Sequence, residues 1–177
     1  MADSGDFPSF DDFFVDIQDL NTSSGQSQNA RGVYVAGVFA LPVIQQPEDK
    51  PAYVSNRPDL LTQFQSASRY GVTGLLAHNY LSGKEFYNLG LGQEVQVIYD
   101  DGTIGSYRVS NIERFQKLVP SSSRSHYIEL DTGNELTTEQ VFRKFYRGSG
   151  RVTFQTCLEG NGILNWGLLF VVAEPTS

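Results

Sequence analysis

Short runs in which apolar and polar residues alternate fill most of the chain from Gly32 onward. β-branched and aromatic side chains at a period of two, bounded by glycine, proline and aspartate, predict strands rather than helices. A tight turn is predicted at residues 100–102, because an Asp-Gly pair tolerates the positive φ that hairpins need. The strand after that turn is long and should bend near Asn111. The predicted strands are residues 34–40, 71–77, 93–99, 104–118, 127–130, 152–157 and 166–174.

The pattern differs at residues 9–20, where apolar side chains recur at helical spacing. Ser9 and Asp12 have the spacing of a capping box. The apolar side of this helix consists of Phe10, Phe13, Phe14, Ile17 and Leu20. We expect the helix to cover the outside of a β domain, with a lid over a binding groove as the alternative. Residues 21–32, rich in Ser, Gln, Asn and Gly, predict a tether, so we divide the chain into 1–32 (helix and tether) and 33–177 (β domain).

Two further helices are predicted inside the β domain. One is a helical turn near residues 59–68, with Asp59 in position to cap it. The other is residues 138–146, which Thr137 and Gln140 begin with a capping box. The end of this second helix is basic, with Arg143, Lys144, Arg147 and, beyond them, Arg151. Cations at this position complement the negative end of the helix dipole.

Composition fits a single β-rich domain. The chain has 177 residues, 40% of them hydrophobic and 12% aromatic, which suits one compact core. The net charge of −7 argues against nucleic-acid binding, because such proteins need cations to displace phosphate counterions. Two histidines and one cysteine are too few for a zinc site. We expect no cofactor, although the acidic pairs at residues 48–49 and 100–101 are weak candidates for calcium.

The single cysteine, Cys157, ends a predicted strand just before a turn-rich segment, residues 158–165. A free cysteine usually packs as a small hydrophobic residue. The alternative is a nucleophile, which needs a nearby base. His78, followed by Asn79, ends the predicted strand 71–77 and is one candidate base. His126 follows a serine-rich stretch and reads as a solvated loop residue.

Several motifs, taken in order, resemble the sortases. They are the thiol of Cys157 at a strand end, the earlier His-Asn pair, and a last strand that ends in Val-Val-Ala-Glu. Residues 85–95 also resemble the family's F-x-x-L and L-x-x-G-D-x-V patterns, with Gln93 at the position of the aspartate. The resemblance extends from about Val33 to Glu174. It implies a mainly β fold, a single closed sortase-type β-barrel of about eight strands with a few short helices.

The resemblance also implies roles for residues. Cys157 as thiolate would attack a threonine carbonyl in a sorting-signal peptide, and protonated His78 would protonate the leaving amine. The Thr156 hydroxyl and the Leu158 N–H are candidate donors to the oxyanion. In the family, an arginine on the final strand completes the site, and here Leu168 occupies that position.

The missing arginine leaves two questions open. Arg147 or Arg151 would supply the charge if the connection before the cysteine strand reaches the site. If no cation replaces the arginine, the barrel is a peptide binder without transfer activity. A cysteine hydrolase, which passes the acyl group to water, is a further alternative.

The expected activity is that of a cysteine transpeptidase, with two partners. One is the sorting signal of a surface protein or pilin, and the other is an amine acceptor at the cell surface. No stretch approaches the roughly 20 apolar residues that span a bilayer. Because sortases usually carry an N-terminal membrane anchor, we expect the opening residues of this chain to replace such an anchor, and the full-length protein to lie outside the cytoplasm. The alternative is a natural protein that is soluble.

Overall fold

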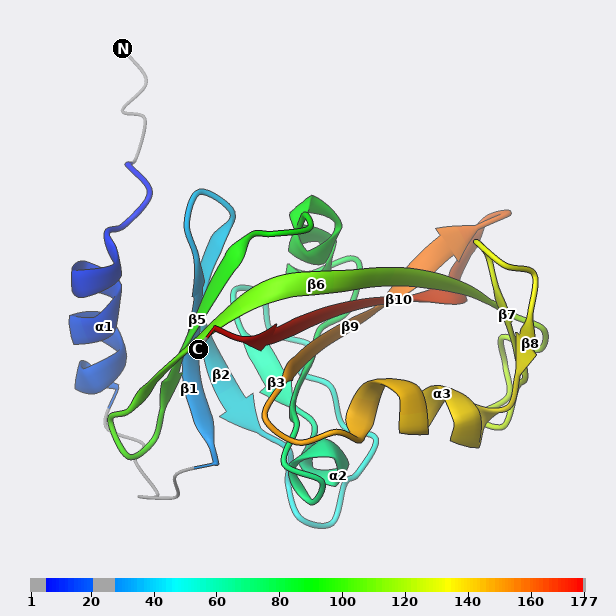
Figure 1. The fold of residues 1–177 in the computed structure, drawn as a ribbon, viewed down its shortest axis with the longest axis horizontal. Helices are drawn as coiled ribbons and strands as arrows, with labels where there is room; N and C mark the ends of the chain where they lie inside the picture. The colour runs from blue at the N-terminus through cyan, green and yellow to red at the C-terminus, as the bar shows by residue number, and fades with distance from the viewer. Residues whose placement is uncertain (1–5, 21–27, 177) are drawn as a thin grey trace.

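The computed structural model of the protein describes residues 6–20 and 28–176. Figure 1 shows a β structure with short helices at its periphery. In chain order the elements are α1 (Phe10–Asp19), β1 (Ala30–Val35), β2 (Phe39–Gln45), β3 (Leu61–Gln63), α2 (Gln65–Ser68), β4 (Thr73–Leu76), the 3-10 helix η1 (Ser82–Asn88), β5 (Glu94–Tyr99), β6 (Ile104–Lys117), β7 (Tyr127–Glu129), β8 (Glu135–Leu136), α3 (Thr138–Tyr146), β9 (Val152–Gly160) and β10 (Ile163–Pro175).

Within the described residues, eight strands close into a barrel because β10 pairs with both β9 and β6. The order around the barrel is β1–β2–β3–β4–β9–β10–β6–β5. The pairs β2–β3 and β4–β9 are parallel and the others are antiparallel, so the barrel is mixed. β7 and β8 extend the sheet beyond β6, at the far end of the long ribbon formed by β6, β9 and β10 (Figure 1). The predicted mainly β barrel is confirmed.

Strand β10 reads as a continuous apolar run because both of its faces are buried. Leu169, Val171 and Ala173 face the barrel interior. Leu168, Phe170 and Val172 face outward and are covered by α3. The rings of Phe145 on α3 and Phe170 stack at a centroid distance of 3.9 Å. Helix α3 therefore packs against the outer face of the strands that carry the candidate site.

Helix α1 covers the opposite side of the barrel. The Ser9 side chain accepts a hydrogen bond from the Asp12 N–H, and Phe13 and Ile17 pack against Tyr34 on β1. β1 lies four strands from β9 in either direction around the barrel. The predicted cover on the outside of the barrel is what the structure shows, and α1 is not a lid over Cys157. Residues 21–27 of the predicted tether lie outside the described residues.

Two segments before residue 70 fold differently from the prediction. Residues 34–40 are not one strand, because Gly37 has φ +72° and turns the chain between β1 and β2. Asp59 has φ 60° and does not cap a helix. Residues 61–63 are instead strand β3, and the short helix α2 begins after Phe64. Here the turn geometry outweighs the local apolar pattern.

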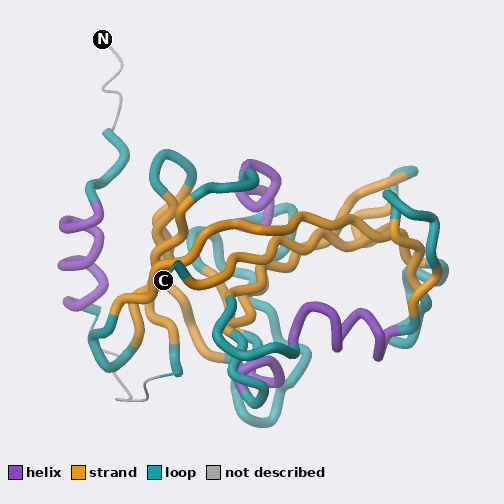
Figure 2. The backbone as a smooth tube through the Cα atoms, viewed as in Figure 1, coloured by secondary structure: helices purple, strands orange, loops and turns teal. Residues whose placement is uncertain are grey.

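The predicted loop at residues 158–165 is mostly strand. β9 continues to Gly160, and Asn161 and Gly162 form a two-residue turn with φ values of 50° and 76°. Positive φ at both positions is the geometry of a type I′ hairpin. The tube view shows this hairpin reaching past the barrel (Figure 2). Helix α3 with its capping box, and the hairpin of β5 and β6, agree with the prediction.

Candidate active site

The pairing of β4 with β9 brings His78 and Cys157 together. The two strands are parallel, with Leu76 beside Gln155. The Ala77 N–H donates to the Gln155 carbonyl (3.4 Å), so the pairing continues past the end of β4. Two residues beyond the Leu76–Gln155 pair on each strand, the same register places His78 beside Cys157. Neighbours in register project to the same face of a sheet, so the imidazole and the thiol belong to one face at the end of the parallel pair.

Cys157 is half-buried on the outer face of β9, where it packs at the edge of the apolar cluster under α3. Burial raises the pKa of its thiol, because a thiolate is poorly solvated there. The positive charge of Lys117 on β6 acts in the opposite direction. No hydrogen bond joins the Cys157 sulfur to the His78 ring, although the structure describes both residues.

His78 is held by its ring and by its backbone. Its ring stacks on the ring of Tyr80 at a centroid distance of 5.0 Å and an angle of 16°. Its carbonyl accepts hydrogen bonds from the N–H groups of Leu81 and Gly83, both at 2.9 Å. A Cβ on Gly83 would lie 2.6 Å from the Ala77 carbonyl oxygen and 2.7 Å from that of His78. Only glycine therefore lets η1 approach the end of β4 this closely.

Tyr87 on η1 connects this helix to the nucleophile strand. Its hydroxyl donates to the Cys157 carbonyl at 2.5 Å. Partial burial raises the pKa of Tyr87, so the phenol remains a donor at neutral pH. The Asn79 side chain donates to the Leu164 carbonyl at 2.9 Å, which ties the His78 segment to the tip of the β9–β10 hairpin.

An open pocket of about 320 Å³ lies beside these groups. It is lined by Asn79, Tyr80, Tyr87, Leu158, Glu159 and Leu164. A larger pocket of about 650 Å³, lined by Gln45, Gln46 and Gln65 among others, lies at the other end of the barrel. The smaller pocket is at the end of the barrel where β4 and β9 end, and although His78 and Cys157 are not among its lining residues, Asn79 and Leu158, which follow them in the chain, are.

The two predicted oxyanion donors are directed elsewhere. Thr156 is buried, and its hydroxyl donates to the Ala77 carbonyl at 2.7 Å. It is therefore committed to the contact between β4 and β9. The backbone carbonyls of Gln155 and Cys157 accept hydrogen bonds from Ala77 at the end of β4 and from Tyr87 on η1. Because backbone direction alternates along a strand, the Leu158 N–H is directed toward β10, where Gly167 is its partner.

Arg147 and Arg151 do not reach the thiol. Arg151 precedes Cys157 by six residues along an extended segment, which corresponds to about 20 Å. Its guanidinium donates to the Lys144 carbonyl (2.5 Å) and the Arg147 carbonyl at the end of α3. Arg147 lies over the ring of Tyr70, 4.7 Å from its centroid. The expectation that either arginine supplies charge to the site is wrong, and Arg151 instead satisfies carbonyls at the helix C-terminus.

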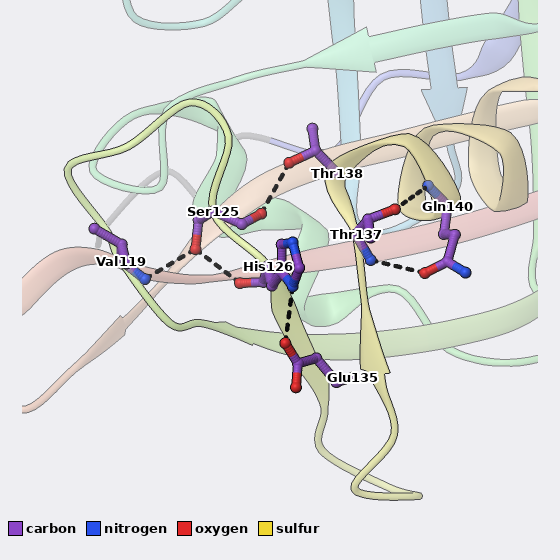
Figure 3. A network of polar contacts seen from close by, with 7 residues as sticks. All are labelled: Val119, Ser125, His126, Glu135, Thr137, Thr138 and Gln140. Carbon is purple, nitrogen blue, oxygen red and sulfur yellow. Dashed lines mark hydrogen bonds and ion pairs between the residues drawn. The ribbon is translucent and has the colours of Figure 1, made fainter.

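The second histidine lies apart from the thiol. His126 precedes β7, and its Nδ1 lies 2.8 Å from a carboxylate oxygen of Glu135 on β8 (Figure 3). Ser125, beside it, accepts a hydrogen bond from the Val119 N–H and has its carbonyl bonded by Thr138. These contacts join the β6–β7 connection to β8 and α3. His126 has a structural contact there, and His78 is the candidate base.

Two further groups near Cys157 carry no signal in the sequence. Tyr87 is separated from Cys157 by 70 residues, and Lys117 reaches it only through the pairing of β9, β10 and β6. No local motif marks either residue. Elsewhere in the described part of the chain, no three His, Cys, Asp or Glu side chains gather as a metal ion requires. Among residues 6–20 and 28–176, no helix has the length and apolar character needed to cross a membrane.

Comparison with known proteins identifies the fold. No family model and no curated protein matches the chain. Solved structures do match. Sortase A of Listeria monocytogenes has a TM-score of 0.53 at 13% identity, over 86% of this chain and 89% of that one. Sortase C-1 of Actinomyces oris has a TM-score of 0.56 at 13% identity, over 97% and 82%. Sortase A of Corynebacterium diphtheriae has a TM-score of 0.55 at 11% identity, over 82% and 60%. The chain therefore has the sortase fold.

Proposed function

We propose that this protein is a sortase-like cysteine transpeptidase acting at the cell surface. The observation that carries the proposal is the β4–β9 register, which sets His78 beside Cys157 at one end of a sortase-type barrel. A thiol and an imidazole on neighbouring strand ends are the minimum set for acyl transfer through a thioester. A pocket at the same end of the barrel, lined partly by tyrosine and leucine side chains, offers aromatic and apolar contacts to a peptide.

The reaction has two halves. The Cys157 thiolate attacks a peptide carbonyl, a thioester forms, and the C–N bond breaks as His78 gives its proton to the leaving amine. A second amine then attacks the thioester, a new amide forms as the C–S bond breaks, and the Cys157 thiolate is restored. His78 takes the proton that the incoming amine loses. The substrate of the first half would be a sorting-signal peptide, and the amine of the second would belong to a pilin or to the cell wall.

Leu168 favours a second candidate function. Its apolar side chain lies opposite Cys157 on β10 and cannot stabilise an oxyanion. A sortase-fold protein that binds peptide without transferring it would need neither the thiol nor the imidazole. A cysteine hydrolase would need both groups, and it would differ from a transpeptidase only in passing the acyl group to water.

Intact mass after incubation with a pooled library of sorting-signal peptides tests the proposal. We expect a mass gain equal to an acyl fragment in the wild type and none in Cys157→Ala. His78→Gln should fold normally and accumulate less acyl-enzyme. Peptide retention on a binding column without any thiol-dependent mass gain would favour the non-catalytic binder. Adding an amine and measuring amide against acid product then separates transfer from hydrolysis.

A further inference from the structure

A carbonyl under attack by Cys157 needs positive charge or hydrogen-bond donors near its oxygen. The Thr156 hydroxyl is bonded to Ala77, and the Leu158 N–H is directed toward β10. Arg147 and Arg151 contact the far end of α3 and its surroundings. If the site is catalytic, another group must provide this stabilisation.

Strand register leads from Cys157 to Lys117. Cys157 pairs with Leu168, and Leu168 pairs in turn with Phe115 on β6. Lys117 lies two residues beyond Phe115, so it projects from the same face of the sheet. β6 and β9 both run antiparallel to β10, so Lys117 is displaced toward the carboxyl end of β9. Two strand spacings and two residues separate the Cα atoms of Lys117 and Cys157 by about 12 Å, and the flexible four-carbon stem spans much of that distance.

The charge of Lys117 is not neutralised by its neighbours. The nearest carboxylates on β6 and β7 are those of Glu113 and Glu129, and both pair with Lys144 on α3 (2.7 and 3.6 Å). No carboxylate in the described part of the chain forms an ion pair with Lys117. Its cross-strand partner is Tyr127, which is buried beside the same cluster. On β9, Glu159 lies two residues beyond Cys157 on the same face, about level with Lys117, so the ammonium has both the thiol and this carboxylate within reach.

We propose that Lys117 is the cationic group of this site, stabilising the Cys157 thiolate and, in an acyl transfer, the negative charge on the attacked carbonyl oxygen. The first half of this proposal, stabilisation of the thiolate, does not depend on the proposed function. The second half, stabilisation of the carbonyl oxygen, rests on it. Lys117 is the cation whose charge opposes the effect of burial on the pKa of Cys157. The other titratable groups near the thiol are Tyr87 and Tyr127, whose pKa values the charge of Cys157 raises, and Glu159 and Arg114, whose charges act on Tyr87. His78 is beside the thiol by the β4–β9 register.

The pH dependence of thiol alkylation tests the first half directly. Cys157 is the only cysteine in the chain, so the mass gain from iodoacetamide reports on this thiol alone. Neutralising Lys117 in Lys117→Met should move the alkylation midpoint to higher pH and slow the reaction at pH 7 by about threefold or more. Lys117→Arg should retain the wild-type midpoint, and Lys50→Met, in an exposed loop, should change nothing. If Lys117→Met does not fold, Lys117→Gln serves in its place.

The outcomes separate the inference from the proposed function. An unchanged midpoint in a folded Lys117→Met protein overturns the inference, even if acyl-enzyme still forms. If Lys117→Arg and Lys117→Met shift the alkylation midpoint equally, the inference is also overturned, because the loss of lysine packing would explain both shifts. A shifted midpoint without acyl-enzyme in any variant overturns the proposed function and leaves the assignment of charge at the thiol in place.

Discussion

Leu168 lies directly opposite Cys157 in the antiparallel pair of β9 and β10. Both side chains project from the outer face, so the residue at position 168 is the immediate neighbour of the thiol. An apolar neighbour excludes water from the thiol and offers nothing to a developing oxyanion. The electrostatics of the site therefore depend on residues farther away, among which Lys117 is a cation that the register places on the same face.

Leu168→Arg should raise turnover. A guanidinium at this position lies beside the thiol and can donate to the carbonyl oxygen, so we expect product formation to increase by about tenfold. Leu168 is 6% exposed, and the free energy of unfolding should fall by about 2 kcal/mol as the charge enters an apolar cluster. Leu168→Met is the size-matched control and should leave both quantities near the wild type. Unchanged turnover in Leu168→Arg would mean that Lys117 already meets the need for charge.

Gly83→Ala should disturb the site through its backbone. The added Cβ would lie within 2.7 Å of two carbonyl oxygens, those of Ala77 and His78, so η1 must shift away from β4. We expect a loss of about 2 kcal/mol or more in unfolding free energy and slower acyl-enzyme formation. Gly90→Ala is the matched control, because nothing lies within 4 Å of its Cβ position. Equal stability of the two variants in denaturant titrations would contradict the close approach.

The thiol should titrate at a higher pH in the folded protein than in the unfolded chain, since burial raises the pKa of Cys157. Alkylation of the native protein should reach half its maximal rate at a higher pH than alkylation in concentrated urea. The same shift makes stability pH-dependent. The Cys157 contribution is complete below the unfolded pKa and is lost as pH rises through the folded pKa. Cys157→Ala should therefore lose less stability than the wild type above about pH 8.5.

Arg151→Met should affect stability and spare the thiol. The guanidinium satisfies two carbonyls at the end of α3, and its loss should cost about 1 kcal/mol in unfolding free energy. Because the site is about 20 Å away along β9, the alkylation profile should match the wild type. Arg143→Met, which breaks an exposed pair with Glu139, is the control and should cost less. A shifted alkylation midpoint in Arg151→Met would contradict this expectation and support the assignment of that arginine to the site.

The sequence predicted correctly those features that residues close to one another in the chain determine. The Thr137–Gln140 capping box marks the start of α3, and the turn at residues 100–102 joins β5 to β6, because each is set by residues close in sequence. The bend expected near Asn111 coincides with the register shift of β6 against β10. Errors occurred at Gly37 and Asp59, where positive φ values redirect the chain and the apolar pattern alone gives no warning.

The candidate site was likewise predictable only in part. Cys157 and His78 stand out because each ends a strand, and their motifs resemble those of one family. Lys117 and Tyr87 carry no such mark, since their proximity to Cys157 arises from strand pairing and from the packing of η1. The error over Arg147 and Arg151 has the same origin. Sequence proximity to Cys157 does not translate into spatial proximity when the intervening residues form an extended strand.

The parallel pairing of β4 with β9 also has a kinetic meaning. Parallel neighbours need a long crossover, and here it contains β5 to β8 and α3. Contacts between residues so distant in sequence form slowly, because most of the loop entropy is lost before they are made. His78 therefore meets Cys157 only when β4 pairs with β9 across this crossover. A chain in which β4 and β9 have not yet paired therefore holds the thiol without its candidate base.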